Sequence, residues 1–148
     1  MTLRWLIAAL HLLALPLGLG GVWMRARFLA RAKIEALASA FAADTAWGIA
    51  AIIWIGTGIW RAFGGLEKGS AYYLQSGAFH AKMGLLILIL ILEIWPMVTL
   101  IKWRVARVRH TSPDLSIAPT LALISYVQAF LVVLMVLAAT AMARGLFN

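Results

Sequence analysis

Residues 79–96 read FHAKMGLLILILILEIWP. This run is apolar enough to form most of a membrane-spanning helix, which needs about 20 apolar residues. It also carries His80 and Lys82 near its start and Glu93 deep inside. A charge at the centre of a bilayer costs about 2.5–3.5 kcal/mol on translocon-insertion scales. We therefore expect a neighbouring polar group to compensate the charge of Glu93.

The composition of the whole chain is that of an integral membrane protein. Of its 148 residues, 64% are hydrophobic and 12% are charged, which is far from the balance of a soluble domain. A single domain of this length cannot bury so much apolar surface within itself, so lipid must solvate it. We predict one domain that covers residues 1–148.

The charge pattern narrows the classes of partner and cofactor. The formal net charge is +8, and the basic residues stand at the ends of apolar runs. That placement is typical of contact with lipid headgroups, and we expect no nucleic-acid partner.

The chain has no cysteine, which excludes disulfides, cysteine-ligated iron–sulfur clusters and thiol nucleophiles.

The hydropathy pattern predicts an all-α fold, a four-helix bundle that crosses the membrane. The first span is expected to be retained because its stronger basic flank follows it, unlike that of a cleaved signal peptide. Residues 25–43 are predicted to form either a helix on the membrane surface or an extension of a span. The predicted spans cover residues 3–24, 44–63, 79–101 and 117–143, each about 20 residues or more.

The basic residues also predict the orientation of the bundle. The first and third connections each hold four Lys or Arg residues, whereas the two termini and the second connection together hold four. The positive-inside rule then places the first and third connections in the cytoplasm and both termini on the other side. We expect a multi-pass protein of the bacterial inner (plasma) membrane.

Small residues are spaced for close helix packing. Ala14 and Gly18 form a small-xxx-small pair in the first span, and Gly48, Gly56 and Gly58 are expected to thin the second span. Such faces permit a homo-oligomer without requiring one.

Two of the polar residues are predicted to meet near the non-cytoplasmic side. His11 lies too deep in the first span to reach the headgroups, which favours a functional or ligand role. Lys82 is predicted to lie in the same leaflet, although its long side chain can alternatively extend to the surface. His80 is at the boundary of its span, where an interfacial position competes with a ligand role.

A second group of polar residues is predicted to lie deeper. Glu93 follows Lys82 by three helical turns on nearly the same face. Gln128 lies at a similar depth in the fourth span, so a hydrogen bond between it and Glu93 is expected. These residues and Asp44 are candidates for a second shell or a proton route. Alternatively, Glu93 is a protonated structural residue, and Asp44 caps the second helix.

Haem is the cofactor that these residues admit. Neutral imidazole is a common axial ligand, and helix bundles hold cofactors between facing helices. His11 is the candidate metal ligand, with His80, Lys82 or a methionine opposite it. The histidine spacing alone does not identify a haem protein.

The chain resembles a bacterial membrane family, domain of unknown function 2214. The matching pieces are DTAWG at residues 44–48, KGSAYYL at residues 68–74 and FHAKMG at residues 79–84. A more distant resemblance is to the HemJ-type protoporphyrinogen oxidases, which are small helical membrane proteins that bind b-type haem.

The HemJ-type resemblance rests on individual residues. It matches His11 within ALHLLAL, an arginine after the first helix (Arg25 or Arg27), and the pair His80 and Lys82. It implies that His11 and Lys82 are the essential residues. The chain departs from that family at Glu93, where a further histidine is usual.

Two functions follow from these observations. The first is a haem-binding membrane oxidoreductase with a porphyrin or quinol substrate. The second is a non-enzymatic membrane subunit or small permease in which the buried polar residues are structural.

Overall fold

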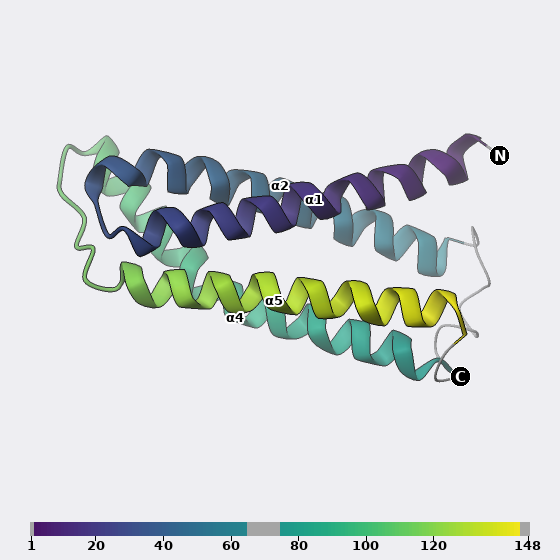
Figure 1. Cartoon of the computed structure of the whole chain (residues 1–148). Coiled ribbons are helices and arrows are strands. Elements are labelled where there is room, and N and C mark those ends of the chain that lie inside the picture. The colour runs from purple at the N-terminus through teal and green to yellow at the C-terminus, as the bar shows by residue number, and fades with distance from the viewer. Residues whose placement is uncertain (1, 65–74, 146–148) are drawn as a thin grey trace.

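The computed structural model describes residues 2–64 and 75–145, and over those residues the chain is helical and contains no strand. Each of the four long helices is long and apolar enough to cross a membrane. The predicted all-α four-helix bundle is therefore confirmed (Figure 1). The KGSAYYL segment lies outside the described residues. The elements are α1 (Thr2–Ala30), the short 3-10 helix η1 (Ile34–Ala36), α2 (Leu37–Phe63), α4 (Gly77–Val108) and α5 (Ala118–Ala143).

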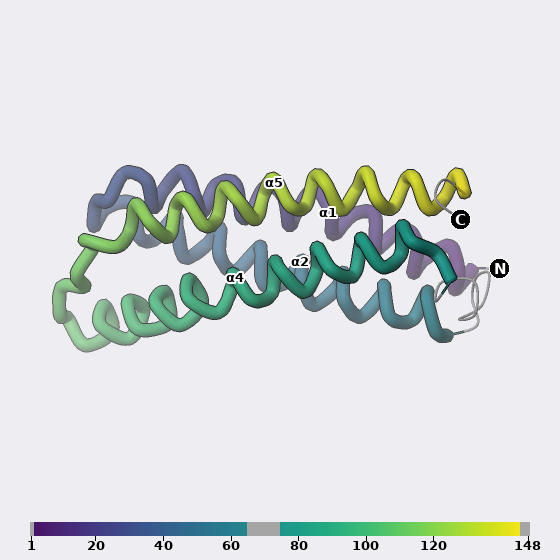
Figure 2. The backbone as a smooth tube through the Cα atoms, turned by 90° about the horizontal axis from the view of Figure 1, so that it is seen from below, coloured from purple at the N-terminus to yellow at the C-terminus, as the bar shows by residue number. Residues whose placement is uncertain are grey.

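The helices form two antiparallel pairs, α1 with α2 and α4 with α5. Helix α1 also packs against α5. At the end where α1 turns into α2 and α4 turns into α5, which we call the turn end, α1, α2 and α5 lie close together, while the last turns of α4 stand apart from α5 (Figure 1, Figure 2). The two pairs diverge toward the opposite end, where α1 begins and α5 ends, which we call the open end (Figure 1, Figure 2).

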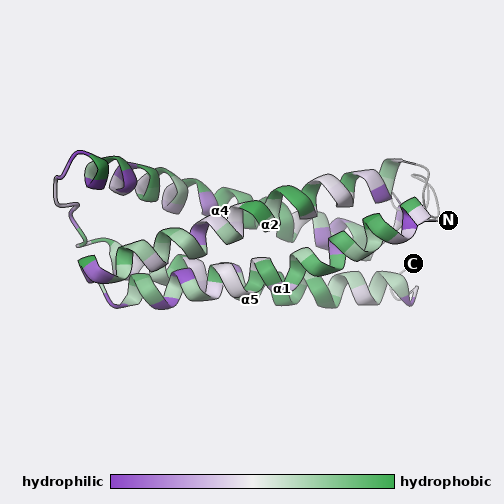
Figure 3. Ribbon diagram, turned by 90° about the horizontal axis from the view of Figure 1, so that it is seen from above, coloured by the Kyte–Doolittle hydropathy of each residue, from purple (hydrophilic) through white to green (hydrophobic). Residues whose placement is uncertain are grey.

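Hydrophobic residues follow the helices along most of their length, while hydrophilic residues are concentrated toward the helix ends and connections (Figure 3). Exposed fractions reach 75% for Ile52, 67% for Leu13 and 59% for Ile91. Such exposure of large apolar side chains is unfavourable in water and ordinary in a bilayer. The distribution therefore agrees with four helices that are surrounded by lipid.

A glycine seam joins α1 to α2. A Cβ atom at Gly21 would lie 2.8 Å from the backbone nitrogen of Trp47 and 3.0 Å from the carbonyl oxygen of Ala43. At Gly18 a Cβ atom would lie 3.2 Å from that of Ala50. The two backbones therefore meet at a distance that only glycine allows, as the small-residue spacing around Gly18 predicts.

The prediction for the glycines of α2 is wrong at two positions. Cβ atoms at Gly48 and Gly56 would meet nothing within 4 Å, so these residues do not mediate packing among the described residues. Gly58 instead faces the imidazole of His11, where a Cβ atom would lie 3.4 Å from Cε1. The seam runs through the glycines of α1 because α2 presents backbone atoms to Gly21 and the side chains of Ala50 and Trp47 to Gly18.

Residues 25–43 extend the two membrane helices and do not form a surface helix. Helix α1 continues to Ala30, and α2 begins at Leu37. Leu37, Ala40 and Ala43 are buried in the bundle, and alanine is the best helix former. Asp44 consequently lies two turns inside α2, so the prediction that it caps this helix is wrong.

Asp114 stabilises a turn in the connection before α5. Its carboxylate accepts hydrogen bonds of 2.9 Å from the backbone N–H and from the hydroxyl of Ser116. These two bonds lower the pKa of Asp114 because they favour its charged form. Pro119 follows in the first turn of α5, where its missing N–H is tolerated.

The seam can be tested with two neighbouring glycines. Gly21→Ala should lower the free energy of unfolding by about 1–3 kcal/mol, because its new methyl group would press on the α2 backbone. Gly20→Ala is the matched control, since a Cβ atom there meets nothing within 4 Å. Unfolding in detergent, followed by circular dichroism, measures both. Equal stability of the two variants would contradict the seam.

Candidate functional site

The centre of the bundle holds a buried arginine. Arg25 of α1 has an exposed fraction of 0%, although the sequence places it in the basic flank of the first span. It lies about five residues from the end of α1, roughly 8 Å along the axis from that end. An arginine at this position must find acceptors among the side chains of the neighbouring helices, because lipid and apolar side chains offer none.

All five N–H groups of the Arg25 guanidinium have acceptors. Nε donates to the hydroxyl of Ser125 at 3.0 Å. One terminal nitrogen donates to Asp44 at 2.8 Å and to Glu93 at 2.7 Å. The other donates to Glu93 at 2.9 Å and to Gln128 at 2.7 Å. Arginine has five donors in a planar fork, so this environment satisfies it completely.

Glu93 is held as firmly as the arginine. Besides the bidentate pair with Arg25, it accepts hydrogen bonds from the indole N–H of Trp47 at 3.0 Å and from the amide of Gln128 at 2.8 Å. All four bonds are donated to its oxygens, which is the arrangement of a carboxylate and not of a protonated acid. The predicted hydrogen bond between Glu93 and Gln128 is confirmed.

Asp44 links this group to a second arginine. One carboxylate oxygen accepts from Arg25 at 2.8 Å, and the other accepts from Arg104 of α4 at 2.7 Å. Two guanidinium groups thus face two carboxylates, and the formal charges cancel. We call Arg25, Asp44, Glu93, Arg104, Ser125 and Gln128 the polar clamp. It contains residues from all four long helices and ties the two helix pairs together.

The sequence offered one indirect signal for Arg25. The glutamate inside the third span predicts a compensating partner, and an arginine is the strongest one available. Arg25 stands among the basic residues that follow the first apolar run, so the sequence suggests an interfacial charge and not a partner for Glu93. Nothing local in the sequence distinguishes it from Arg27, which is exposed.

A cavity of about 640 Å³ lies at the open end, between the diverging helix pairs. Its lining is mostly apolar and comes from all four long helices. The ionisable groups that line it are His11, Arg61 and Lys82, and no acidic residue is among the described lining residues. A pocket of this size and character suits an apolar ligand that carries negative charge. His11 and Lys82, predicted to approach each other, do line the same cavity.

His11 is oriented by residues of one turn of α2. Its Nδ1 lies 2.9 Å from the hydroxyl oxygen of Thr57. Its ring centroid lies 5.9 Å from that of Trp54, with the two planes tilted by 49°. Gly58 leaves room for the ring. These three residues lie on one face of α2, since their spacing is that of neighbouring turns.

His80 stands apart from this cavity. It is exposed and is not among the lining residues. Its Nδ1 donates to the carbonyl oxygen of Ser76 at 2.9 Å, one turn earlier in the chain. The structure therefore brings His11 together with Lys82 and leaves His80 on the outside.

Glu93, Gln128 and Asp44 also lie away from the cavity, in the polar clamp. An apolar cluster separates the clamp from the cavity. It includes Val22, Ile89 and Val132 at its buried centre, and Leu15, Leu86 and Met135, which line the cavity. Among the described residues, Glu93, Gln128 and Asp44 therefore surround Arg25 and not His11, as the prediction of an outer shell around a His11 site had required.

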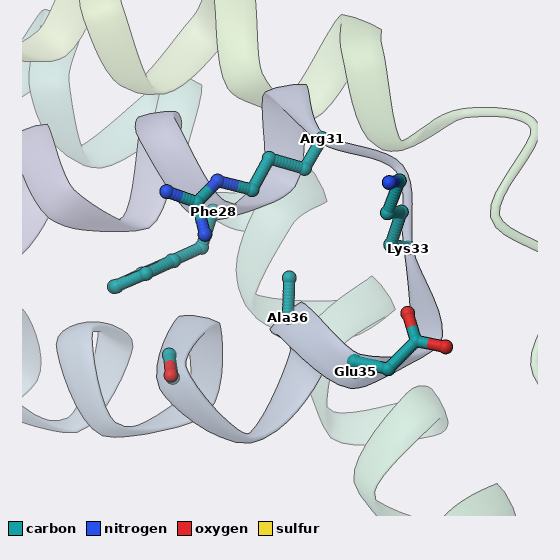
Figure 4. Close-up of a pocket in the computed structure, with 6 residues that line it drawn as sticks. Phe28, Arg31, Lys33, Glu35 and Ala36 are labelled. Atoms are coloured by element: carbon teal, nitrogen blue, oxygen red, sulfur yellow. The ribbon is translucent and has the colours of Figure 1, made fainter.

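A second hollow, of about 490 Å³, lies at the turn between α1 and α2 (Figure 4). The guanidinium of Arg31 lies 5.4 Å from the centroid of the Phe28 ring, a cation–π contact that packs one wall. Lys33 and Glu35 stand at its rim. Over the described residues, no group of three or more His, Asp or Glu side chains could hold a metal ion, here or elsewhere.

The polar clamp can be tested by a double-mutant cycle. Arg25→Met should lower the free energy of unfolding by about 3–5 kcal/mol, because it leaves Glu93 buried without its partner. Combining it with Glu93→Met should restore part of the loss, with a coupling of about 0.5–3 kcal/mol, since Asp44 and Arg104 still pair.

Arg27→Met is the control for this cycle, because Arg27 is exposed two residues away. It should change the stability by less than about 0.5 kcal/mol. Denaturation in mixed detergent, followed by circular dichroism, gives the stability of the wild type, Arg25→Met, Glu93→Met, their double variant and Arg27→Met. Additive single losses would show that Arg25 and Glu93 do not interact.

Comparison with known proteins agrees with the architecture. No curated protein and no solved structure matches the chain. The family model described as a predicted membrane protein, DUF2214, matches residues 3–146. This match covers nearly the whole chain, including all four long helices. The chain therefore belongs to the DUF2214 family of membrane proteins.

Proposed function

We propose that this protein is a membrane redox protein that binds haem b in the cavity at the open end, with His11 as an axial ligand. The observation that carries the proposal is an oriented imidazole in an otherwise mostly apolar cavity of about 640 Å³. Neutral imidazole is a common ligand of haem iron, and an apolar pocket suits the haem macrocycle. The distant resemblance to HemJ-type proteins supports the same assignment.

The charged lining residues suit the haem propionates. Arg61 and Lys82 both line the cavity, and each can bind a carboxylate. Met83 and Met135 line it too and, with Lys82, would be the candidates for a second iron ligand. The proposal does not use His80, because its ring lies outside the cavity.

A bound haem would supply one-electron transfer between a reduced substrate and an acceptor. The protein would contribute the axial ligand, the propionate partners and an apolar lining that excludes water. Porphyrins and quinols are the substrate classes that we propose, since both have largely apolar bodies. The polar clamp would hold the helices around this site and take no part in the chemistry.

The second candidate is a non-enzymatic membrane subunit or small permease. It is favoured by the complete hydrogen bonding of Arg25, which a structural role would require. Under this function the clamp specifies helix packing, and the cavity holds lipid. The two candidates differ in whether His11 binds a chromophore.

An absorption spectrum distinguishes them. Protein purified in detergent after haem-replete expression should show a Soret band that shifts on reduction with dithionite. His11→Ala should remove this band while leaving the helix content unchanged, because it deletes the ligand and not the clamp. His80→Ala, the matched control, should keep the band. A flat spectrum after addition of haem, or a band that survives in His11→Ala, would refute the proposed site.

A further inference from the structure

We infer that Thr57 is a positioning residue that fixes the tautomer of His11, so that Nδ1 carries the proton and Nε2 carries the lone pair. This inference deepens the proposed function and rests on it, because Nε2 then carries the lone pair through which an imidazole ligates a metal centre. It also makes a claim about the imidazole itself, which can be measured without any haem.

The first step concerns the single hydroxyl proton of Thr57. The hydroxyl oxygen lies 2.6 Å from the carbonyl oxygen of Ile53 and 3.3 Å from that of Trp54, both on its own helix. Two oxygens at 2.6 Å repel each other unless a hydrogen lies between them. A carbonyl oxygen has no hydrogen, so Thr57 must donate its proton to Ile53.

The second step follows for His11. Toward Nδ1, at 2.9 Å, the oxygen of Thr57 offers only a lone pair. A hydrogen bond at this distance then requires the proton to reside on Nδ1. In the neutral ring the lone pair consequently resides on Nε2. Hydrogen bonding at one ring nitrogen is the usual way in which proteins set the nitrogen that binds metal.

The third step is the orientation of the ring. Trp54 contacts one side of the imidazole, and the absent side chain of Gly58 leaves space at Cε1. A methyl group on Gly58 would sit 3.4 Å from Cε1. Thr57 lies between these two residues in sequence and supplies the directional contact. Packing places the ring, and the hydrogen bond selects its tautomer.

The variants that test this inference differ by single atoms. Thr57→Val has the same shape as threonine but no hydroxyl, so it removes the acceptor for Nδ1–H. Thr57→Ser keeps the hydroxyl and should rescue the effect. Thr45→Val is the matched control, because Thr45 of α2 also donates to a carbonyl one turn earlier, that of Phe41 at 2.9 Å, but its hydroxyl oxygen faces Arg104 and not His11.

The first measurement is nitrogen NMR of haem-free protein with labelled histidine, at a pH where the ring is neutral. The chain has three histidines, so the His11 signals are assigned by their loss in His11→Ala. The expected spectrum shows a protonated Nδ1 and an unprotonated Nε2 in the wild type, Thr57→Ser and Thr45→Val. Thr57→Val should show exchange between tautomers. A protonated Nε2 in the wild type, or an unchanged spectrum in Thr57→Val, would overturn the inference.

The second measurement is haem affinity by absorption titration. Thr57→Val should weaken binding about 10–100-fold, as losses of outer-shell partners of ligating histidines do. Thr57→Ser and Thr45→Val should bind as the wild type does. Equal affinity in Thr57→Val would overturn the role of Thr57 in ligand positioning. The expected tautomer in a protein that binds no haem would support the inference and refute only the proposed function.

Discussion

A guanidinium that is buried among apolar helices dictates what must surround it. Arg25 needs five acceptors, and residues of the other three long helices supply them. Removing one partner of such a buried pair typically costs about 3–5 kcal/mol, so the arrangement is specified far more strongly than apolar contact alone would specify it. Apolar helices in lipid gain little from choosing one neighbour over another, because lipid tails are as apolar as leucine. The polar clamp therefore defines the register and the depth at which the four helices meet.

The position of the clamp also explains where the cavity lies. The glycine seam fixes α1 against α2 at Gly18 and Gly21, and the clamp joins the two helix pairs in the same half of the bundle. Toward the open end they diverge, and the space between them becomes the cavity around His11. The apolar cluster between the clamp and the cavity keeps the ion pairs away from a ligand there. The polar clamp and the proposed ligand site around His11 are thus separated along the bundle axis.

Much of this architecture could be predicted from the sequence. Four runs of apolar residues are enough to predict four membrane helices, and the depth of Glu93 and Gln128 predicts their hydrogen bond. That His11 and Lys82 line one cavity follows from the same depth argument. The sequence could not reveal that Arg25 is buried, because depth at a helix end depends on how far the helix continues. Since α1 runs on to Ala30, Arg25 lies within the bundle and not at its surface.

The other wrong predictions, for Asp44, Gly48 and Gly56, also arise because helix ends and packing faces depend on the rest of the fold. Asp44 looked like a helix cap because the apolar run begins after it, yet the alanine-rich segment before it is also helical. The glycines at positions 48 and 56 have the right spacing for packing but face away from α1. Spacing shows which residues share a face, whereas the partner of that face is set by long-range contacts. Thr57 carried no signal in the sequence, because a threonine within an apolar helix has many structural roles.

The central claim is that the polar clamp holds the two helix pairs in one relative arrangement. Distance measurements between two spin labels by double electron–electron resonance test it most directly. The chain has no cysteine, so labels can be attached specifically at introduced cysteines. Labels would be attached through Leu13→Cys on α1 and Leu137→Cys on α5, two exposed positions on different helix pairs. The account predicts a single narrow distance distribution in the otherwise wild-type chain and in Arg27→Met, and a broad distribution in Arg25→Met. A distribution that stays equally narrow in Arg25→Met would contradict it.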